Sequence, residues 1–269
     1  MTLSTVLSLF LIHLGIGIGF TLALVSREAG VKFFRFNAGL AATLIAIGFA
    51  FREPIAGISP VVESVALISL GICEFALVLY WGTVGRALAS LRSTLVVLAI
   101  AGGIAVLVAH AFAVPIRGGG LERIIAAASF LTSSALMGGA CGSMILGHWY
   151  LILPSMDVGL LQSMVKFHIA SLVVRIVVVA AAIFMAIAAW QPGMGPSFER
   201  YVFSLDGIFF WQRVLFGLLG PALLSYLTWE TAKIRSTQSA TGILYVDFFT
   251  VVVGEVLAKY LLLVTSVPV

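Results

Sequence analysis

The feature that most constrains this chain is a series of long apolar stretches bounded by charged residues, proline or glycine. Each stretch has about 20 predominantly apolar residues, the length that an α-helix needs to cross the hydrocarbon core of a membrane. Such stretches recur along all 269 residues, of which 61% are hydrophobic and 10% charged. Helices satisfy their own backbone groups inside lipid. The sequence therefore predicts an all-α fold, a polytopic integral membrane helical bundle that forms a single domain over residues 1–269.

Hydropathy and helix-breaking residues divide the chain into eight expected transmembrane helices. They cover residues 3–25, 34–51, 60–82, 92–115, 124–152, 162–190, 207–230 and 240–264. An even number puts both chain ends on one side of the membrane, called side A here; the opposite side is side B. The side-B connections carry eight Lys and Arg residues, more than those of side A, and such an excess is typical of the cytoplasmic side. We expect both termini on the non-cytoplasmic side of a bacterial inner or plasma membrane.

Several classes of function find no support in the sequence. The formal net charge is +4, but the 15 Lys and Arg residues are scattered at helix ends and form no stripe for nucleic acid. Cys73 and Cys141 fall inside expected spans, and no motif for c-type haem attachment occurs. Motifs of hydrolases and ATP-binding loops are absent. The GIGIG stretch at 15–19 lacks the strand context of a dinucleotide-binding loop, so we expect it to serve close helix packing.

Ionisable residues inside the expected spans are the most informative feature. They cost free energy in the bilayer, and so they normally face the bundle interior and pair. They are His13, Glu63, Glu74, His110, His148, His168, Arg175, Arg213, Asp247, Glu255 and Lys259. Arg175 lies near the middle of its span, level with Glu255 and within about two helix turns of Glu74. We expect Arg175 to pair with one of these carboxylates, as a packing contact or as part of a proton path.

His148 and His168 are expected at one level, roughly 9 Å inside side B on the two arms of a hairpin. Ser134, Cys141 and His148 recur every seven residues and share a face of mostly small residues. We consider His148 and His168 as the two metal ligands of a b-type haem, with the small residues of 133–144 beside the macrocycle. The alternative is that both histidines hydrogen-bond to other helices while the Gly and Ser residues allow close helix contact.

Two further sets of residues are weaker candidates. His13 and His110 could hold a second haem, although helix rise leaves an axial offset of roughly 7 Å between them. Asp247 follows the polar stretch 236–242 and, with His148, His168 and Lys166, makes side B a candidate quinone pocket, because a quinone headgroup needs hydrogen-bonding groups at the edge of an apolar slot. The same stretch could simply cap the last helix.

These observations favour two classes of function. The first is a membrane subunit of a respiratory-type electron-transfer complex that binds b-type haem, quinone or both and works with partner redox subunits; it would be at most a quinone-reactive subunit of an oxidoreductase. Eight spans with intramembrane histidines and carboxylates and little extramembrane mass make the chain similar to cytochrome b-type and quinol-oxidising anchor subunits in architecture. The second is a proton- or solute-coupled transporter or channel lined by Arg175, Glu74, Asp247 and Glu255. A structural membrane subunit without a cofactor is the third alternative.

Overall fold

The computed structural model describes residues 2–54, 58–87, 89–114, 116, 119–153, 156–191 and 197–269, and within them it contains helices and no strand. Eight helical segments are long and apolar enough to cross a membrane. They are Leu3–Leu24, Arg27–Ala50, Pro60–Thr83, Ala89–Ala113, Gly120–Ile152, Val158–Ala188, Leu205–Lys233 and Thr237–Thr265. Each overlaps one expected span, which confirms the prediction of a polytopic helical bundle. The protein is an integral membrane protein.

Seven of these segments are built around one long α-helix each. The helices are α1 (Leu3–Leu24), α2 (Gly30–Ala50), α3 (Pro60–Thr83), α4 (Arg92–Ala113), α5 (Gly120–Ile152), α6 (Val158–Ala188) and α10 (Thr237–Thr265). Short 3-10 helices, η1 (Arg27–Ala29) and η2 (Ala89–Leu91), precede α2 and α4. A short helix, α7 (Phe198–Val202), and a 3-10 turn, η3 (Leu205–Gly207), lie in the connection after α6.

The seventh segment is composite, which the sequence did not predict. It consists of α8 (Ile208–Val214), a π-helical turn η4 (Leu215–Leu219) and α9 (Gly220–Lys233). Pro221 stands in the first turn of α9. Because proline has no backbone N–H, the carbonyl of Gly217 loses its regular helical partner, and the chain widens at this point.

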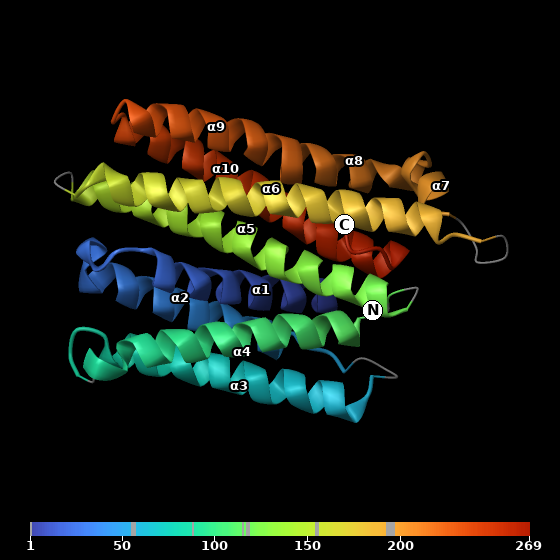
Figure 1. The fold of residues 1–269 in the computed structure, drawn as a ribbon, viewed down its shortest axis with the longest axis horizontal. Helices are drawn as coiled ribbons and strands as arrows, with labels where there is room; N and C mark the ends of the chain where they lie inside the picture. Colours follow the sequence, from blue (N-terminus) through green and yellow to red (C-terminus); the bar gives the residue numbers. More distant parts are fainter. Residues whose placement is uncertain are drawn as a thin grey trace.

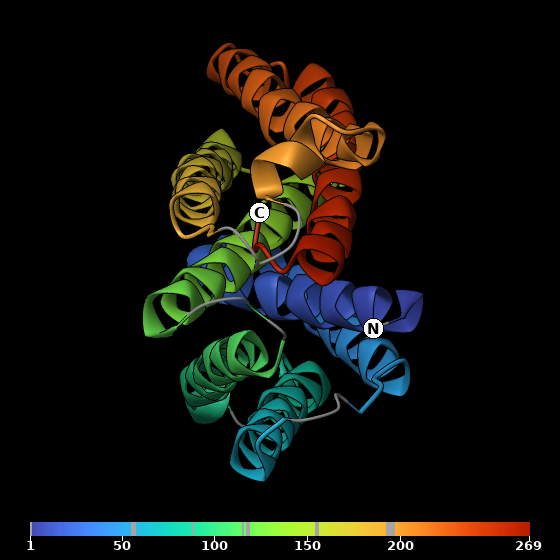
Figure 2. The same cartoon turned by 90° about the vertical axis from the view of Figure 1, so that its right-hand side faces the viewer.

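The helices pack as two neighbouring groups that meet at α1 and α5. One group contains α1 to α4, in which α1 packs on α2 and α3 on α4; the other contains α5, α6, α8, α9 and α10. Figure 1 shows the helices running along one common direction, and Figure 2 shows the two groups end-on, above and below the layer of α1 and α5. The ionisable residues of α6, α8 and α10 thus belong to the second group.

Glycines let α1 and α5 pack backbone against backbone. A Cβ atom at Gly17 would overlap the main-chain oxygen of Ser134, and one at Gly138 would overlap the backbone of Gly17. A Cβ at Gly15 would lie 2.7 Å from the main-chain oxygen of Ala41 on α2. The GIGIG stretch therefore serves close helix packing, as its sequence context predicted.

Replacing Gly138 with alanine is expected to lower the free energy of unfolding by about 1–3 kcal/mol, because the added methyl group overpacks the crossing of α1 and α5. Gly71→Ala is the matched control, since a Cβ at Gly71 meets nothing within 4 Å. Titration of the detergent-solubilised protein with dodecyl sulfate, followed by circular dichroism, measures both variants. Equal stability of the two variants would contradict so close a crossing.

Candidate functional site

A buried carboxylate, Glu255 of α10, joins four helices by charged and polar contacts. Its Oε1 accepts hydrogen bonds from Arg175 Nε of α6 at 3.1 Å and from Arg213 Nη2 of α8 at 2.9 Å. Its Oε2 accepts from Arg175 Nη2 at 3.2 Å and from Ser133 Oγ of α5 at 2.5 Å. All four side chains are buried. These contacts fix the relative positions of α5, α6, α8 and α10 in the interior of the bundle.

Lys259, one turn further along α10, brings a third basic side chain to this carboxylate. Its Nζ lies 3.8 Å from Glu255 Oε2 and donates a hydrogen bond to Ser133 Oγ at 2.7 Å. The resulting ionic centre consists of Arg175, Arg213, Glu255 and Lys259. It holds three basic groups and one carboxylate, so two bases have no counter-charge within it.

The two guanidinium groups of the ionic centre differ in how well they are satisfied. Arg175 Nη1 donates to Ser129 Oγ at 2.6 Å, and its Nη2 donates to the main-chain oxygen of Val269 at 3.2 Å. Arg213 Nε and Nη1, by contrast, have no hydrogen-bond partner among the described residues. A buried donor without a partner costs free energy. Glu255 therefore provides the contact that offsets the burial of Arg213.

The predicted pairing of Arg175 is confirmed for one of its two expected partners. Arg175 binds Glu255, in a contact made by two nitrogens and both carboxylate oxygens. Glu74, the other expected partner, lies on α3 in the first helical group and lines a separate cavity against α2. Depth along the helices gave the correct partner as one of two alternatives.

Sequence reasoning gave Arg213 and Lys259 no role with this carboxylate, because both stand close to the side-A ends of their expected spans. The structure buries both completely or nearly so. One signal in the sequence was available for Lys259: it follows Glu255 by four residues, a spacing that puts opposite charges on one helix face. No local pattern identifies Arg213, which reaches the centre from a different helix.

A second buried ionic contact joins α6 to α10 nearer side B. His168 Nε2 lies 2.7 Å from Asp247 Oδ2, and neither side chain is exposed. The contact is one of distance, because neither atom makes a hydrogen bond among the described residues. His168 precedes Arg175 by seven residues and Asp247 precedes Glu255 by eight, so this contact lies roughly 10–12 Å from the ionic centre along the same two helices. Asp247 and His168, two of the predicted site residues, are therefore partners.

His148, which the sequence matched with His168, lies elsewhere. It is exposed, and its Nδ1 is 3.0 Å from Tyr245 Oη of α10. The backbones of α5 and α6 lie close together beside His168. A Cβ atom added at Gly139 would be only 3.1 Å from His168 Cα. This packing leaves no space for a macrocycle between the two helices, and the residues present do not fit a b-type haem there.

His13 and His110 are brought together despite their expected offset. His13 Nε2 lies 3.3 Å from His110 Nδ1, and the rings stack with centroids 5.5 Å apart. Phe130 packs its edge against His13 at 4.7 Å between centroids. The cavity beside His110 holds only about 30 Å³, which is far less than a haem occupies. The pair therefore forms a direct contact between α1 and α4 and does not fit a haem.

Two cavities lie at opposite ends of the second helical group. The side-B cavity, of about 510 Å³, is lined by residues of α5 and of the start of α10, including Thr241 and Tyr245. The side-A cavity, of about 330 Å³, is lined by the start of α5, the end of α6, α7 and the residues that follow α10. Val267 lines the side-A cavity, and Val269 accepts from Arg175. The ionic centre thus adjoins the floor of the side-A cavity.

The arrangement defines a class of protein, a helical membrane bundle with a buried ionic centre between two cavities. No family model matches the chain, and no curated protein matches it either. Among the described residues, no group of three or more His, Cys, Asp and Glu side chains could hold a metal ion. Inferences about function therefore depend on the contacts of the chain itself.

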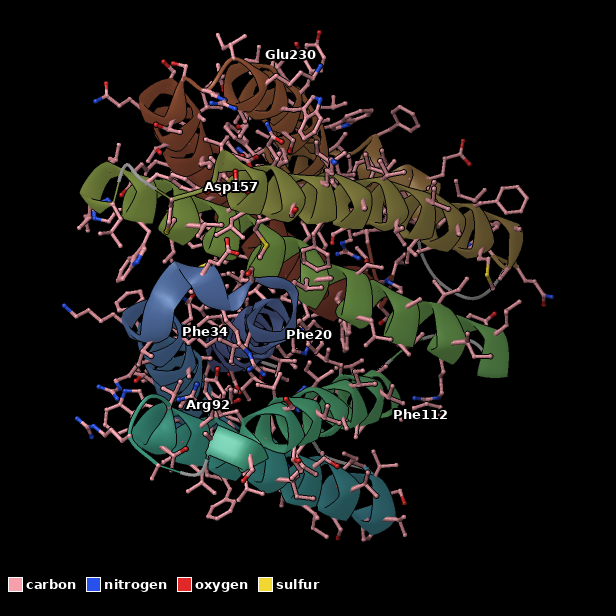
Figure 3. All side chains as sticks on the ribbon, turned by 60° about the vertical axis from the view of Figure 1, so that its left-hand side comes forward. Phe20, Phe34, Arg92, Phe112, Asp157 and Glu230 are labelled. Carbon is pink, nitrogen blue, oxygen red and sulfur yellow. The ribbon has the colours of Figure 1, made fainter. Side chains whose placement is uncertain are left out.

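Glu255→Gln is expected to lower the free energy of unfolding by about 3–5 kcal/mol, because it leaves the buried basic groups without their counter-charge. The control is Glu230→Gln, which removes an exposed 2.7 Å pair with Lys233 on the outer side of α9 (Figure 3) and should cost at most about 1 kcal/mol. The dodecyl sulfate titration compares the two. If the two variants unfold at the same dodecyl sulfate concentration, the ionic centre does not hold the helices together.

Proposed function

We propose that this protein is a proton-conducting membrane transporter or channel whose route follows α6 and α10. The observation that carries the proposal is the stacking of two buried ionic contacts on these helices, His168 with Asp247 and Arg175 with Glu255. Ionisable side chains are costly at such depth, and where they occur in series they mark ion and proton pathways. One ionic pair is enough to fix the packing of two helices, so packing alone does not explain a second pair between α6 and α10.

Hydroxyl groups occupy the interval between the two contacts. Ser171 of α6 and Thr250 of α10 are buried between the levels of Asp247 and Glu255, and Thr250 Oγ1 donates to the main-chain oxygen of Asp247 at 2.8 Å. A hydroxyl group both donates and accepts hydrogen bonds. Together with water, these groups supply the exchange partners that a proton needs over an interval of roughly 10 Å.

Each end of this series approaches a cavity. On side B, Thr241 lines the cavity and is buried on α10 six residues before Asp247. On side A, Arg175 contacts Val269, which adjoins the cavity lined by Val267. With side B as the cytoplasmic side, as the basic residues of the connections predict, the route would lead from the cytoplasm to the outside.

Lys259 is the member of the ionic centre best suited to exchange a proton. Arginine does not lose its proton in proteins, whereas lysine does so readily when it is buried. An ionic centre with two bases in excess is most costly when all of them are charged. Loss of the Lys259 proton removes part of the excess positive charge. Ser133 contacts both Lys259 and Glu255 and provides a path for that proton.

The electron-transfer function stays a prediction from the sequence. Neither histidine pair fits a b-type haem in the described packing. The proton route needs no haem. Of the two classes of function that the sequence favours, the contacts of α6 and α10 support the second.

Asp247→Asn is expected to reduce proton flux on the order of 100-fold, because the amide cannot exchange a proton with His168. The purified protein is reconstituted in liposomes that contain a pH-sensitive dye, and a potassium diffusion potential drives proton entry. Lys259→Met should reduce the flux as well, and Glu230→Gln is the control at the surface. Flux through both buried variants at the rate of the control, with folding verified by circular dichroism, would overturn the proposal.

A further inference from the structure

The side-A cavity combines apolar walls with a few hydrogen-bonding groups. Ile125, Met185 and Val264 contribute apolar surface from three helices, and Glu122 and Tyr201 contribute a carboxylate and a phenol. Its volume of about 330 Å³ lies within the usual range for small-molecule sites. The cavity is large enough for one substituted ring and lies where α5 begins and α6 ends.

Two polar groups of this cavity have hydrogen-bonding capacity left over. Tyr201 Oη is buried and has no hydrogen-bond partner within the described part of the chain. Burial, with smaller contributions from Tyr260 and Asp206, raises the pKa of Tyr201, so its phenol stays a donor. Glu122 Oε2 accepts from the Gly119 N–H at 2.7 Å, which caps α5, and among the described residues its second oxygen is left for another donor. Tyr201 and Glu122 thus offer the cavity a donor and an acceptor.

The lining disfavours an anionic ligand. An anion would meet the Glu122 carboxylate, and the described residues that line the cavity include no Lys, Arg or His to neutralise it. An uncharged ligand that donates to Glu122 avoids this penalty.

We propose that the side-A cavity binds a lipid-soluble hydroquinone, with one ring hydroxyl donating to Glu122 and a ring oxygen accepting from Tyr201. A hydroquinone is uncharged, donates and accepts through the same oxygens, and reaches the cavity from the bilayer. The aromatic side chains Trp190 and Phe198 also line the cavity and offer ring surfaces against which a flat ring packs. The site lies on side A, opposite to the side-B pocket that the sequence favoured for a quinone. It goes beyond proton conduction and does not depend on it.

Binding is measured with tritium-labelled 2-decylhydroquinone on the whole protein in lipid nanodiscs, after subtraction of the ligand held by empty nanodiscs. Unlabelled 2-decylhydroquinone should displace the label, whereas 2-decyl-1,4-dimethoxybenzene, which has the same ring and tail but no hydroxyl donor, should displace it at least roughly tenfold less well. Palmitate tests a site for anionic lipids and should not compete. Equal displacement by the dimethoxy compound or by palmitate would overturn the proposal.

Two variants locate the site. Glu122→Gln retains an oxygen that can cap α5 and Tyr201→Phe removes a single oxygen atom, so both should fold; each is expected to weaken binding roughly tenfold. Tyr245→Phe, at the side-B cavity, is the matched control and should bind as the unchanged protein does. If both side-A variants bind the label normally, the proposal is wrong. Binding of the label and proton flux in the liposome assay are separate measurements, so a loss of binding in these variants supports this proposal whatever their flux is.

Discussion

The second helical group depends on one carboxylate. Glu255 contacts side chains from α5, α6 and α8 as well as Lys259 of its own helix, so four helices share one negative charge. If the helices separated within a bilayer, no water would be present to solvate the three basic groups, and they would lose the carboxylate that offsets their charge. The local irregularities nearby serve this contact. The π-helical turn and Pro221 reshape the seventh segment next to Arg213, and Gly217 meets Gly254 where a Cβ on either residue would collide with its neighbours.

Helix α5 connects the two helical groups because its small residues point in two directions. Ser129 and Ser133 face the ionic centre and bind Arg175, Glu255 and Lys259. Ser134 and Gly138, on the other face, meet the backbone of α1. Larger residues on α5 would fit neither the ionic centre nor α1. The ionic centre needs short hydroxyl side chains, and the crossing with α1 needs glycine at its closest point. The side chains of the ionic centre are buried, which makes its charged contacts stronger than they would be at a surface.

The sequence predicts the transmembrane helices and one of the ionic pairs well, because hydropathy and depth along a helix are local properties. Depth placed Arg175 level with Glu255, and the two do pair. Depth failed for the two histidines, because it was counted from an expected span end at residue 162 whereas α6 begins at Val158. The residue of α5 beside His168 is Gly139, nine residues before His148, so His148 lies roughly 13 Å from the level of His168 along α5. His148 contacts Tyr245 at the surface, and His168 contacts Asp247. Arg213 reaches the ionic centre from a helix distorted by a π-helical turn, and no periodic pattern encodes that contact.

The two ionic contacts on α6 and α10 differ in a way that bears on proton conduction. His168 and Asp247 are one base and one acid, so the pair can be neutral in total whether the proton lies on nitrogen or on oxygen. The ionic centre has no such balance, since its two arginines stay charged and Glu255 offsets only one of them. In the proposed route its surplus positive charge would repel an incoming proton, which would pass only when Lys259 gives one up. In the proposed route the ionic centre is therefore the barrier, and the His168–Asp247 contact is the site that supplies protons to it.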